Sequence, residues 1–174
     1  RARSEPPILN IRNGTKEWFL NGKLHREKGP AVEHKNGKKE WFLNGKLHRE
    51  KGPAVVFPDG TEHWYSLGRL HSNKGPAICN SVIGLDEWYL NGDRHRKDGP
   101  AIEWSGGINA WYFNGKLHRV DEPAIIHLNG KKEWWLNGER HRIDRPAVEN
   151  PVENCDDIED MVEEWWLNGK RHRD

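Results

Sequence analysis

Two residue types with chemically useful side chains recur along this chain at a nearly constant interval. The histidines of the recurring pair are His25, His48, His71, His95, His118, His141 and His172. The arginines that follow them are Arg26, Arg49, Arg96, Arg119, Arg142 and Arg173, and Ser72 stands where the series is interrupted. An imidazole can ligate a metal or act as a general base, and a guanidinium binds carboxylates and phosphates.

The spacing of the histidines argues against a catalytic or metal centre. If each interval holds two β-strands, successive histidines lie about 10 Å apart. Zinc ligands each lie roughly 2 Å from the ion, so they must be much closer together than that, and a nucleophile must reach its base by a hydrogen bond. We therefore expect no enzymatic activity, no metal site and no cofactor, and we expect each imidazole to bond a neighbouring backbone group or Asp and so fix a loop.

The arginines leave two alternatives open. Each can form a structural pair with a nearby acidic residue such as Asp98, Asp121 or Asp144, or the series can form a basic stripe that meets an anionic polymer or a phosphate. Lysines at a second recurring position could widen such a stripe, namely Lys23, Lys46, Lys116 and Lys170. Exposed aromatic side chains beside the stripe could stack on nucleobases.

The elements that must position these residues are copies of one repeat, marked by a tryptophan ladder. Its members are Trp18, Trp41, Trp64, Trp88, Trp111, Trp134 and Trp165, at intervals of 23, 23, 24, 23, 23 and 31 residues. A fixed period of this size indicates a repeat array. A second aromatic residue follows each tryptophan, so core stacking is the expected use of both columns.

Each repeat carries turn signals that predict hairpins. Asn-Gly favours a type I′ turn, because that turn needs φ > 0 at two successive residues. A two-residue turn at Asn36-Gly37 would place Val32 opposite Trp41, and Asn44-Gly45 would begin the crossing to the next hairpin. The predicted fold is all-β: an elongated antiparallel β-meander of about seven hairpin repeats, forming a single array over residues 1–174.

Composition limits the remaining possibilities. Only 34% of residues are hydrophobic and the mean hydropathy is −1.02, but ten Trp contradict disorder and favour a thin structure with little core per residue. No apolar run approaches the roughly 20 residues of a membrane span. Cys79 and Cys155 belong to hairpins three repeats apart, beyond disulfide reach. Separate thiols suit a reducing compartment, so we expect a cytoplasmic protein.

The repeat is interrupted once, by an acidic insertion at about residues 149–164. Pro151 and the apolar positions 152, 155, 158 and 161/162 predict a short amphipathic helix over about 151–162. This insertion could cap the end of the sheet or dock a basic partner. Its candidate binding residues are Asp156, Asp157, Glu159 and Asp160.

The period of 23, the hairpin and the string Trp-x-x-Asn-Gly-Lys-x-His resemble MORN repeats, over nearly the whole chain. The sequence pattern Trp-Tyr-Leu-Asn-Gly-Lys-x-His-Arg-x-Asp-Gly-Pro-Ala is similar to repeats of uncharacterised phage and giant-virus proteins. The sequence departs from the usual MORN motif, which has a Gly-x-Gly after the Lys-x-His segment. Here Arg26 and Pro30 stand near those positions. The resemblance implies a single-layer β-meander that binds partners, membranes or copies of itself.

The function that these observations favour is a non-enzymatic scaffold that binds a protein partner or self-associates. Recognition would then lie in the irregular parts, Cys79–Gly84 and Asn150–Glu164. The alternative is a binder or decoy for a phosphate-containing ligand or a nucleic acid, acting through the His-Arg stripe, such as a viral inhibitor of host defence. Salt dependence separates the two, because phosphate binding weakens steeply as salt rises.

Overall fold

The computed structural model describes residues 8–151 and 164–173, and every regular element in these ranges is a β-strand. The all-β antiparallel meander of hairpin repeats is therefore confirmed. Most of the predicted helix over 151–162 lies outside the described residues. The chain forms two compact units. Unit 1 comprises residues 1–82 and 88–92, and unit 2 comprises residues 83–87 and 93–174.

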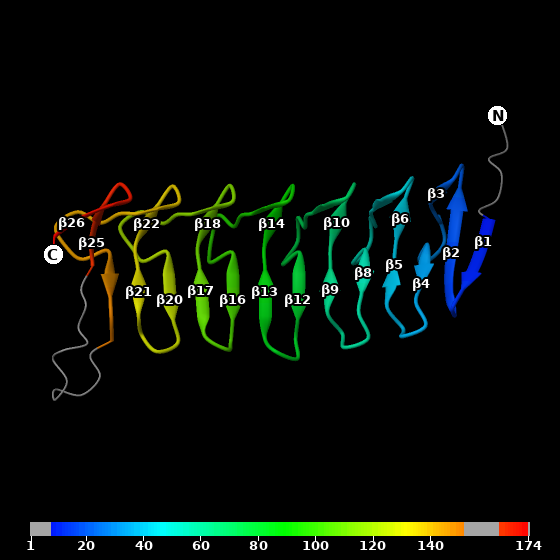
Figure 1. The fold of residues 1–174 in the computed structure, drawn as a ribbon, viewed down its shortest axis with the longest axis horizontal. Coiled ribbons are helices and arrows are strands. Elements are labelled where there is room, and N and C mark those ends of the chain that lie inside the picture. The colour runs from blue at the N-terminus through cyan, green and yellow to red at the C-terminus, as the bar shows by residue number, and fades with distance from the viewer. Residues whose placement is uncertain (1–7, 152–163, 174) are drawn as a thin grey trace. The chain divides into compact units, whose positions relative to one another are not determined.

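In unit 1, antiparallel strands follow one another in the order β1-β2-β4-β5-β8-β9-β12. Short hairpins β2–β3, β6–β7 and β10–β11 follow one another along one side of this row (Figure 1). The strands of unit 1 are β1 (Ile8–Arg12), β2 (Thr15–Leu20), β3 (Lys23–Leu24), β4 (Val32–Glu33), β5 (Lys39–Glu40), β6 (Phe42–Leu43), β7 (Lys46–Leu47), β8 (Val55–Val56), β9 (Glu62–His63), β10 (Tyr65–Ser66), β11 (Arg69–Leu70), β12 (Ile78–Asn80) and β14 (Tyr89–Leu90).

Unit 2 repeats the plan, with the order β13-β16-β17-β20-β21-β24 and short hairpins β18–β19, β22–β23 and β25–β26. Its strands are β13 (Leu85–Glu87), β15 (Asp93–Arg94), β16 (Ile102–Trp104), β17 (Ile108–Ala110), β18 (Tyr112–Phe113), β19 (Lys116–Leu117), β20 (Ile125–His127), β21 (Lys132–Glu133), β22 (Trp135–Leu136), β23 (Glu139–Arg140), β24 (Val148–Glu149), β25 (Trp165–Leu167) and β26 (Lys170–Arg173).

The first turn of the repeat differs from the prediction by one residue. Val32 lies opposite Glu40, so the predicted pairing with Trp41 is wrong. The loop has three residues and ends in Gly37 at φ 91°, whose N–H donates to the carbonyl of His34 over 2.9 Å. This is the geometry of a type I turn followed by a left-handed glycine. A shift of one residue in the pairing of two strands moves the side chains of one strand to the opposite face of the sheet. In the register observed here, Val32 lies on the buried face and is only 3% exposed.

The same Asn-Gly signal gives a two-residue turn elsewhere. Asn13 and Gly14 have φ of 50° and 78°, and there Leu9 does lie opposite Trp18. The second turn of the repeat also follows the prediction. Asn44 and Gly45 have φ of 51° and 80°, and the strands that they join pair Leu43 with Lys46.

The most deeply buried residues form a row of alanines that was not predicted from the sequence. Each has no exposed surface: Ala31, Ala54, Ala77, Ala101, Ala124 and Ala147. The carbonyl of each alanine in this row other than Ala101 accepts the N–H of the preceding ladder tryptophan, for example over 2.8 Å from Trp41 to Ala54. Trp134 is buried at 7% exposure, whereas the other described ladder tryptophans are half-buried. Each unit therefore has a thin core in which neighbouring repeats meet.

We predict that the substitution Trp134→Ala costs about 3–5 kcal/mol of unfolding free energy, because it removes a large buried aromatic side chain. Trp104→Ala should cost clearly less, since Trp104 lies off the ladder and is 39% exposed. Urea denaturation of the two variants measures both losses. Equal losses would show that the tryptophan ladder is not part of the core.

Candidate functional site

The recurring arginines lie flat against the ladder tryptophans. The guanidinium carbon is 3.8 Å from the ring centroid for Arg26 on Trp18 and 4.0 Å for Arg49 on Trp41. The same stacking occurs in unit 2, at 3.9 Å for Arg119 on Trp111 and 3.6 Å for Arg142 on Trp134. A planar guanidinium is suited to this contact because it combines cation–π attraction with face-to-face packing.

The same arginines close the crossing loop that leads to the next hairpin. The Nη1 group of each donates to the carbonyl of the proline four residues later, at 3.1 Å for Arg26, 3.2 Å for Arg49, 3.0 Å for Arg96, 3.2 Å for Arg119 and 3.0 Å for Arg142. Carboxylates complete the contacts. Glu33, Glu103 and Glu149 each pair with the arginine seven residues earlier, and Glu122 pairs with Arg119. The expected pairing of these arginines with a nearby acidic residue is therefore confirmed, and in these four pairs the acidic residue is a glutamate.

Glycine in the crossing loop makes room for the arginine. A Cβ added at Gly52 would lie 2.9 Å from the guanidinium of Arg49, and Gly52 has φ of 144°. Two loops of unit 2 lack this glycine, and Glu122 and Arg145 stand in its place. In those loops the preceding residues, Asp121 and Asp144, take left-handed φ values of 61° and 63°. The aspartates therefore help to shape the backbone of the loop.

Each described histidine of the row down to His141 accepts a hydrogen bond at Nδ1 from a backbone N–H in the second turn of the next repeat. The expected contact with neighbouring backbone is confirmed. The donors are Asn44 for His25 (3.1 Å), Leu67 for His48 (3.3 Å), Asn91 for His71 (3.2 Å), Asn114 for His95 (3.2 Å), Asn137 for His118 (3.2 Å) and Asn168 for His141 (3.3 Å). An acceptor at Nδ1 requires an imidazole without a proton on that atom. These rings therefore position the adjoining repeat.

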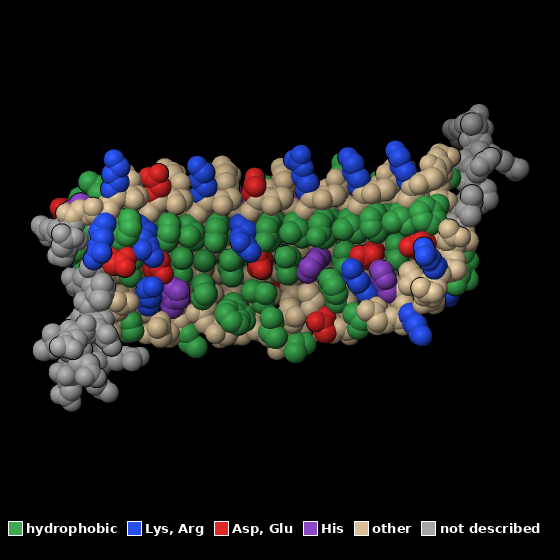
Figure 2. Space-filling view, viewed as in Figure 1, with side chains coloured by type: hydrophobic (Ala, Val, Ile, Leu, Met, Phe, Trp, Pro, Cys, Tyr) green, Lys and Arg blue, Asp and Glu red, His purple; other side chains and the backbone are tan. Residues whose placement is uncertain are grey.

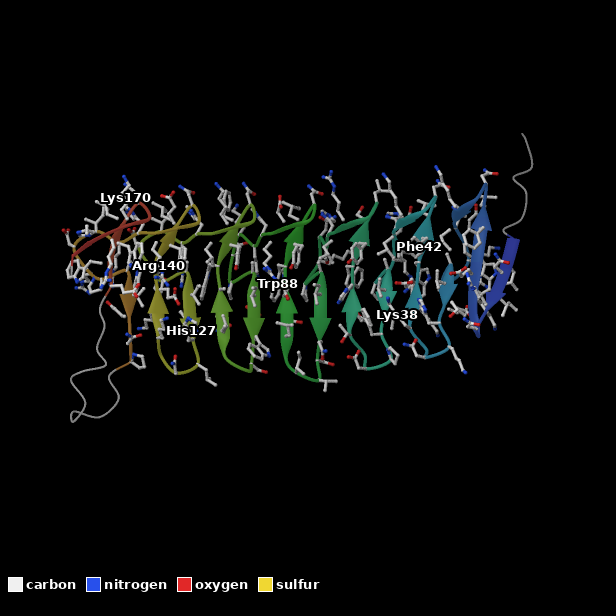
Figure 3. The ribbon with its side chains drawn as sticks, in the orientation of Figure 1. Lys38, Phe42, Trp88, His127, Arg140 and Lys170 are labelled. Atoms are coloured by element: carbon white, nitrogen blue, oxygen red, sulfur yellow. The ribbon has the colours of Figure 1, made fainter. Side chains whose placement is uncertain are left out.

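The opposite face of unit 1 carries a half-buried band that we call the apolar stripe. It consists of three cross-strand pairs, Phe19–Leu24, Phe42–Leu47 and Tyr65–Leu70. Residues opposite one another in a hairpin share a face. Figure 2 shows an unbroken hydrophobic band over β2, β6 and β10, and Phe42 is labelled there in Figure 3. These aromatic residues were predicted to lie in the core, and the leucines opposite them were not predicted from the sequence.

In unit 2, Arg94 and Arg140 stand where unit 1 has leucines, whereas Leu117 remains opposite Tyr112. Arg94 lies 5.6 Å from the ring of Tyr112. Arg140 lies 5.3 Å from the ring of Trp135 and 5.4 Å from that of Trp166, and it also pairs with Glu164 at 2.7 Å (Figure 3). The aromatic rings of unit 2 are therefore covered in part by internal cation–π contacts.

Two glutamates of this face lie in equivalent clusters. Glu40 pairs with His34 at 2.9 Å and Lys38 at 2.7 Å, and Glu133 pairs with His127 at 3.0 Å and Lys131 at 3.2 Å. Burial raises the pKa of each carboxyl, but hydrogen bonds from the histidine and lysine outweigh this effect. The pKa values of Glu40 and Glu133 therefore lie below their ordinary values. Such carboxylates stay ionised and hold the hairpin in register.

One concave region of unit 2 has a volume of about 440 Å³. It lies between the loop at Arg96–Gly99 and the hairpin that contains Phe113 and His118. Phe113 is 48% exposed, and its ring centroid lies 4.9 Å from that of His95 and 5.9 Å from that of His118. The two arginines that line it already have internal partners, so the region offers mainly aromatic surface.

The remaining candidates are only partly placed. The backbone of Arg173 belongs to β26, whereas Asp156, Asp157, Glu159 and Asp160 lie outside the described residues. Within residues 8–151 and 164–173, His, Cys, Asp and Glu form no group of three that could hold a metal ion. In those ranges, no helix is long and apolar enough to cross a membrane.

Comparison with known proteins identifies no family for this chain: no protein-family model matches it, and no curated protein does.

We predict that Arg142→Lys lowers the unfolding free energy by about 1–2 kcal/mol, because lysine keeps the charge but loses the planar contact with Trp134 and the bond to the Pro146 carbonyl. Arg145→Lys is the matched control, since Arg145 is exposed three residues away, and it should change stability by less than about 0.5 kcal/mol. Chemical denaturation compares the two. Equal, negligible changes would mean that the arginine series has no structural role.

Proposed function

We propose that this chain is a non-enzymatic, MORN-like repeat scaffold that binds a protein partner or a second copy of itself. The observation that carries the proposal is the apolar stripe of unit 1. Its six residues are half-buried, so each keeps part of its surface open to solvent, and they lie in register over three successive hairpins. A contiguous apolar surface of this kind is typical of interaction sites.

The contacts of the histidines and arginines support a structural role for the repeated His-Arg pair. Each described imidazole of the row down to His141 accepts a backbone N–H from the next repeat, and the arginines bond to proline carbonyls inside their own loops. An arginine that bound phosphate would have to give up part of these contacts. This consideration weighs against the polyanion-binding alternative and leaves the apolar face as the better candidate for recognition.

We predict that Phe42→Ser lowers either the self-association of the chain or its capture of a protein from extracts of its native host, by about tenfold or more, because central apolar contacts dominate interfaces. Leu128→Ser is the matched control, since Leu128 is 77% exposed in a turn of unit 2. Sedimentation velocity and affinity capture provide the readouts, and urea denaturation shows whether the variant stays folded. A folded Phe42→Ser variant with undiminished association and capture would contradict the proposal.

The polyanion alternative predicts a different result for the arginines. If they form a binding stripe, each replacement in the series Arg49→Ala, then with Arg96→Ala, then with Arg119→Ala, should lower the salt slope of binding to a single-stranded oligonucleotide by about one. We expect a weak and unchanged slope, with stability falling along the series. A stepwise fall in slope would overturn the preferred function.

A further inference from the structure

The basic charge of the chain is concentrated in unit 1. Its described residues contain thirteen Lys and Arg against seven Asp and Glu, a net charge of +6. The described residues of unit 2 contain thirteen basic and twelve acidic side chains, a net charge of +1. The apolar stripe of unit 1 therefore lies in a positive environment, which favours an acidic binding partner.

Three of these cations form a row at the second turns, next to the apolar stripe. Lys23, Lys46 and Arg69 directly precede the stripe residues Leu24, Leu47 and Leu70 in the sequence. We call these three residues the basic row. Figure 2 shows basic side chains projecting at regular intervals along this edge of the molecule. Successive members are two strands apart, which corresponds to about 10 Å.

The stems of the basic row are held in place. The side-chain carbons of Lys23, Lys46 and Arg69 lie 3.5–4.0 Å from the positions that a Cβ would take at Gly45, Gly68 and Gly92. An aliphatic stem packed in this way keeps its charged head in solvent. Within the described part of the chain, none of the three has an ion pair.

Unit 2 does not present the same surface. The equivalent second-turn positions there are Asp93, Lys116, Glu139 and Lys170, which alternate in sign. Arginines also occupy leucine positions in its aromatic band and stack on the rings. The combination of an uninterrupted apolar stripe with a basic row therefore belongs to unit 1.

The chain itself contains a segment with the complementary chemistry. Residues 152–163, VENCDDIEDMVE, carry six carboxylates, no basic residue and apolar side chains that include Ile158, Met161 and Val162. Twelve residues can span at most about 40 Å when extended and about 18 Å as a helix. The basic row spans about 20 Å from its first to its third member, since it covers two intervals of about 10 Å. One segment can therefore reach all three cations.

We propose that the apolar stripe and basic row of unit 1 bind the acidic segment 152–163 of a second copy of this chain. The carboxylates pair with Lys23, Lys46 and Arg69, and the apolar side chains of the segment cover Phe42 and its neighbours. This inference rests on the proposed function and names the partner. The surface patch and the segment are different parts of the chain, so the contact is heterologous and can join more than two copies.

A charge-swap experiment tests the proposal by sedimentation velocity. The first variant reverses the basic row with Lys23→Glu, Lys46→Glu and Arg69→Glu. The second reverses the segment with Asp156→Lys, Asp157→Lys, Glu159→Lys and Asp160→Lys. We expect the wild-type chain to self-associate more weakly as salt rises, and each variant alone to associate about tenfold more weakly or not at all, because like charges now face each other.

Mixing the two variants should restore association, because each reversed surface then meets its complement. The matched control is Lys97→Glu with Lys116→Glu and Lys132→Glu, which removes the same charge from unit 2 and should leave self-association unchanged. A wild-type chain that stays monomeric at the highest concentration would overturn the inference. So would a basic-row variant that associates like the wild type, or a mixture that does not associate although both variants show wild-type urea denaturation.

The experiment also separates this inference from the proposed function. If the wild-type chain is monomeric but still captures a host protein that Phe42→Ser releases, the scaffold function stands and the second copy is the wrong occupant. If the chain neither self-associates nor captures a protein through the stripe, both proposals fail.

Discussion

Each repeat depends on its neighbour for the hydrogen bonds of its own second turn. The N–H of Asn137 donates to Nδ1 of His118, and the N–H of Gly138 donates to the carbonyl of Leu117 over 2.9 Å. A two-residue turn holds two residues at positive φ, and it leaves polar backbone groups that need partners. Because the preceding repeat supplies these partners, the turn, the loop and the next hairpin are placed together. This dependence on nearest neighbours explains how a chain with so small a core can fold.

The two faces of the repeat use their aromatic residues differently. On one face, Trp134 is covered by Arg142, which is fixed in turn by the carbonyl of Pro146, so little of that face remains for a partner. On the other face of unit 1, Phe42 is opposite Leu47 and no charged side chain belongs to the stripe. The tryptophan–arginine face thus carries contacts that stabilise the repeat, and the phenylalanine–leucine face of unit 1 is the face to which we assign the proposed binding role.

Much of the fold follows from the sequence because its signals are local. The second Asn-Gly requires positive φ at both residues, and Asn44 and Gly45 adopt it. The first Asn-Gly could not be assigned locally, since Asn13-Gly14 and Asn36-Gly37 are the same dipeptide in two different turns. What separates the two registers is burial. Val32 is 3% exposed in its register, whereas Leu9 is 47% exposed in the other.

The site was less predictable for a related reason. The sequence identified the arginine series and the pairing of its members with acidic residues. Arg142 also contacts the Pro146 carbonyl and the ring of Trp134, and neither of these carries a charge that a search for ion pairs would find. The leucines of the apolar stripe could have been found from the hairpin register, because a two-residue turn at Asn44-Gly45 places Phe42 opposite Leu47. Charge alone does not identify such a surface; the pairing of strands is needed as well.

The third repeat shows how strongly neighbours determine local conformation. Leu67 stands where other repeats have asparagine, and it adopts φ of 49°. For a branched aliphatic residue this conformation costs roughly 1–2 kcal/mol, and its side chain gains little burial in return because it is 57% exposed. The turn nevertheless keeps its geometry. The N–H of Leu67 still donates to Nδ1 of His48 over 3.3 Å, and the aliphatic side-chain carbons of Lys46 still pack against Gly68. Since the local sequence disfavours this turn, the contacts with the preceding repeat must supply the free energy that maintains it. The same contacts hold Lys46 at the edge of the apolar stripe, so the spacing of the basic row is a consequence of how the repeats are joined.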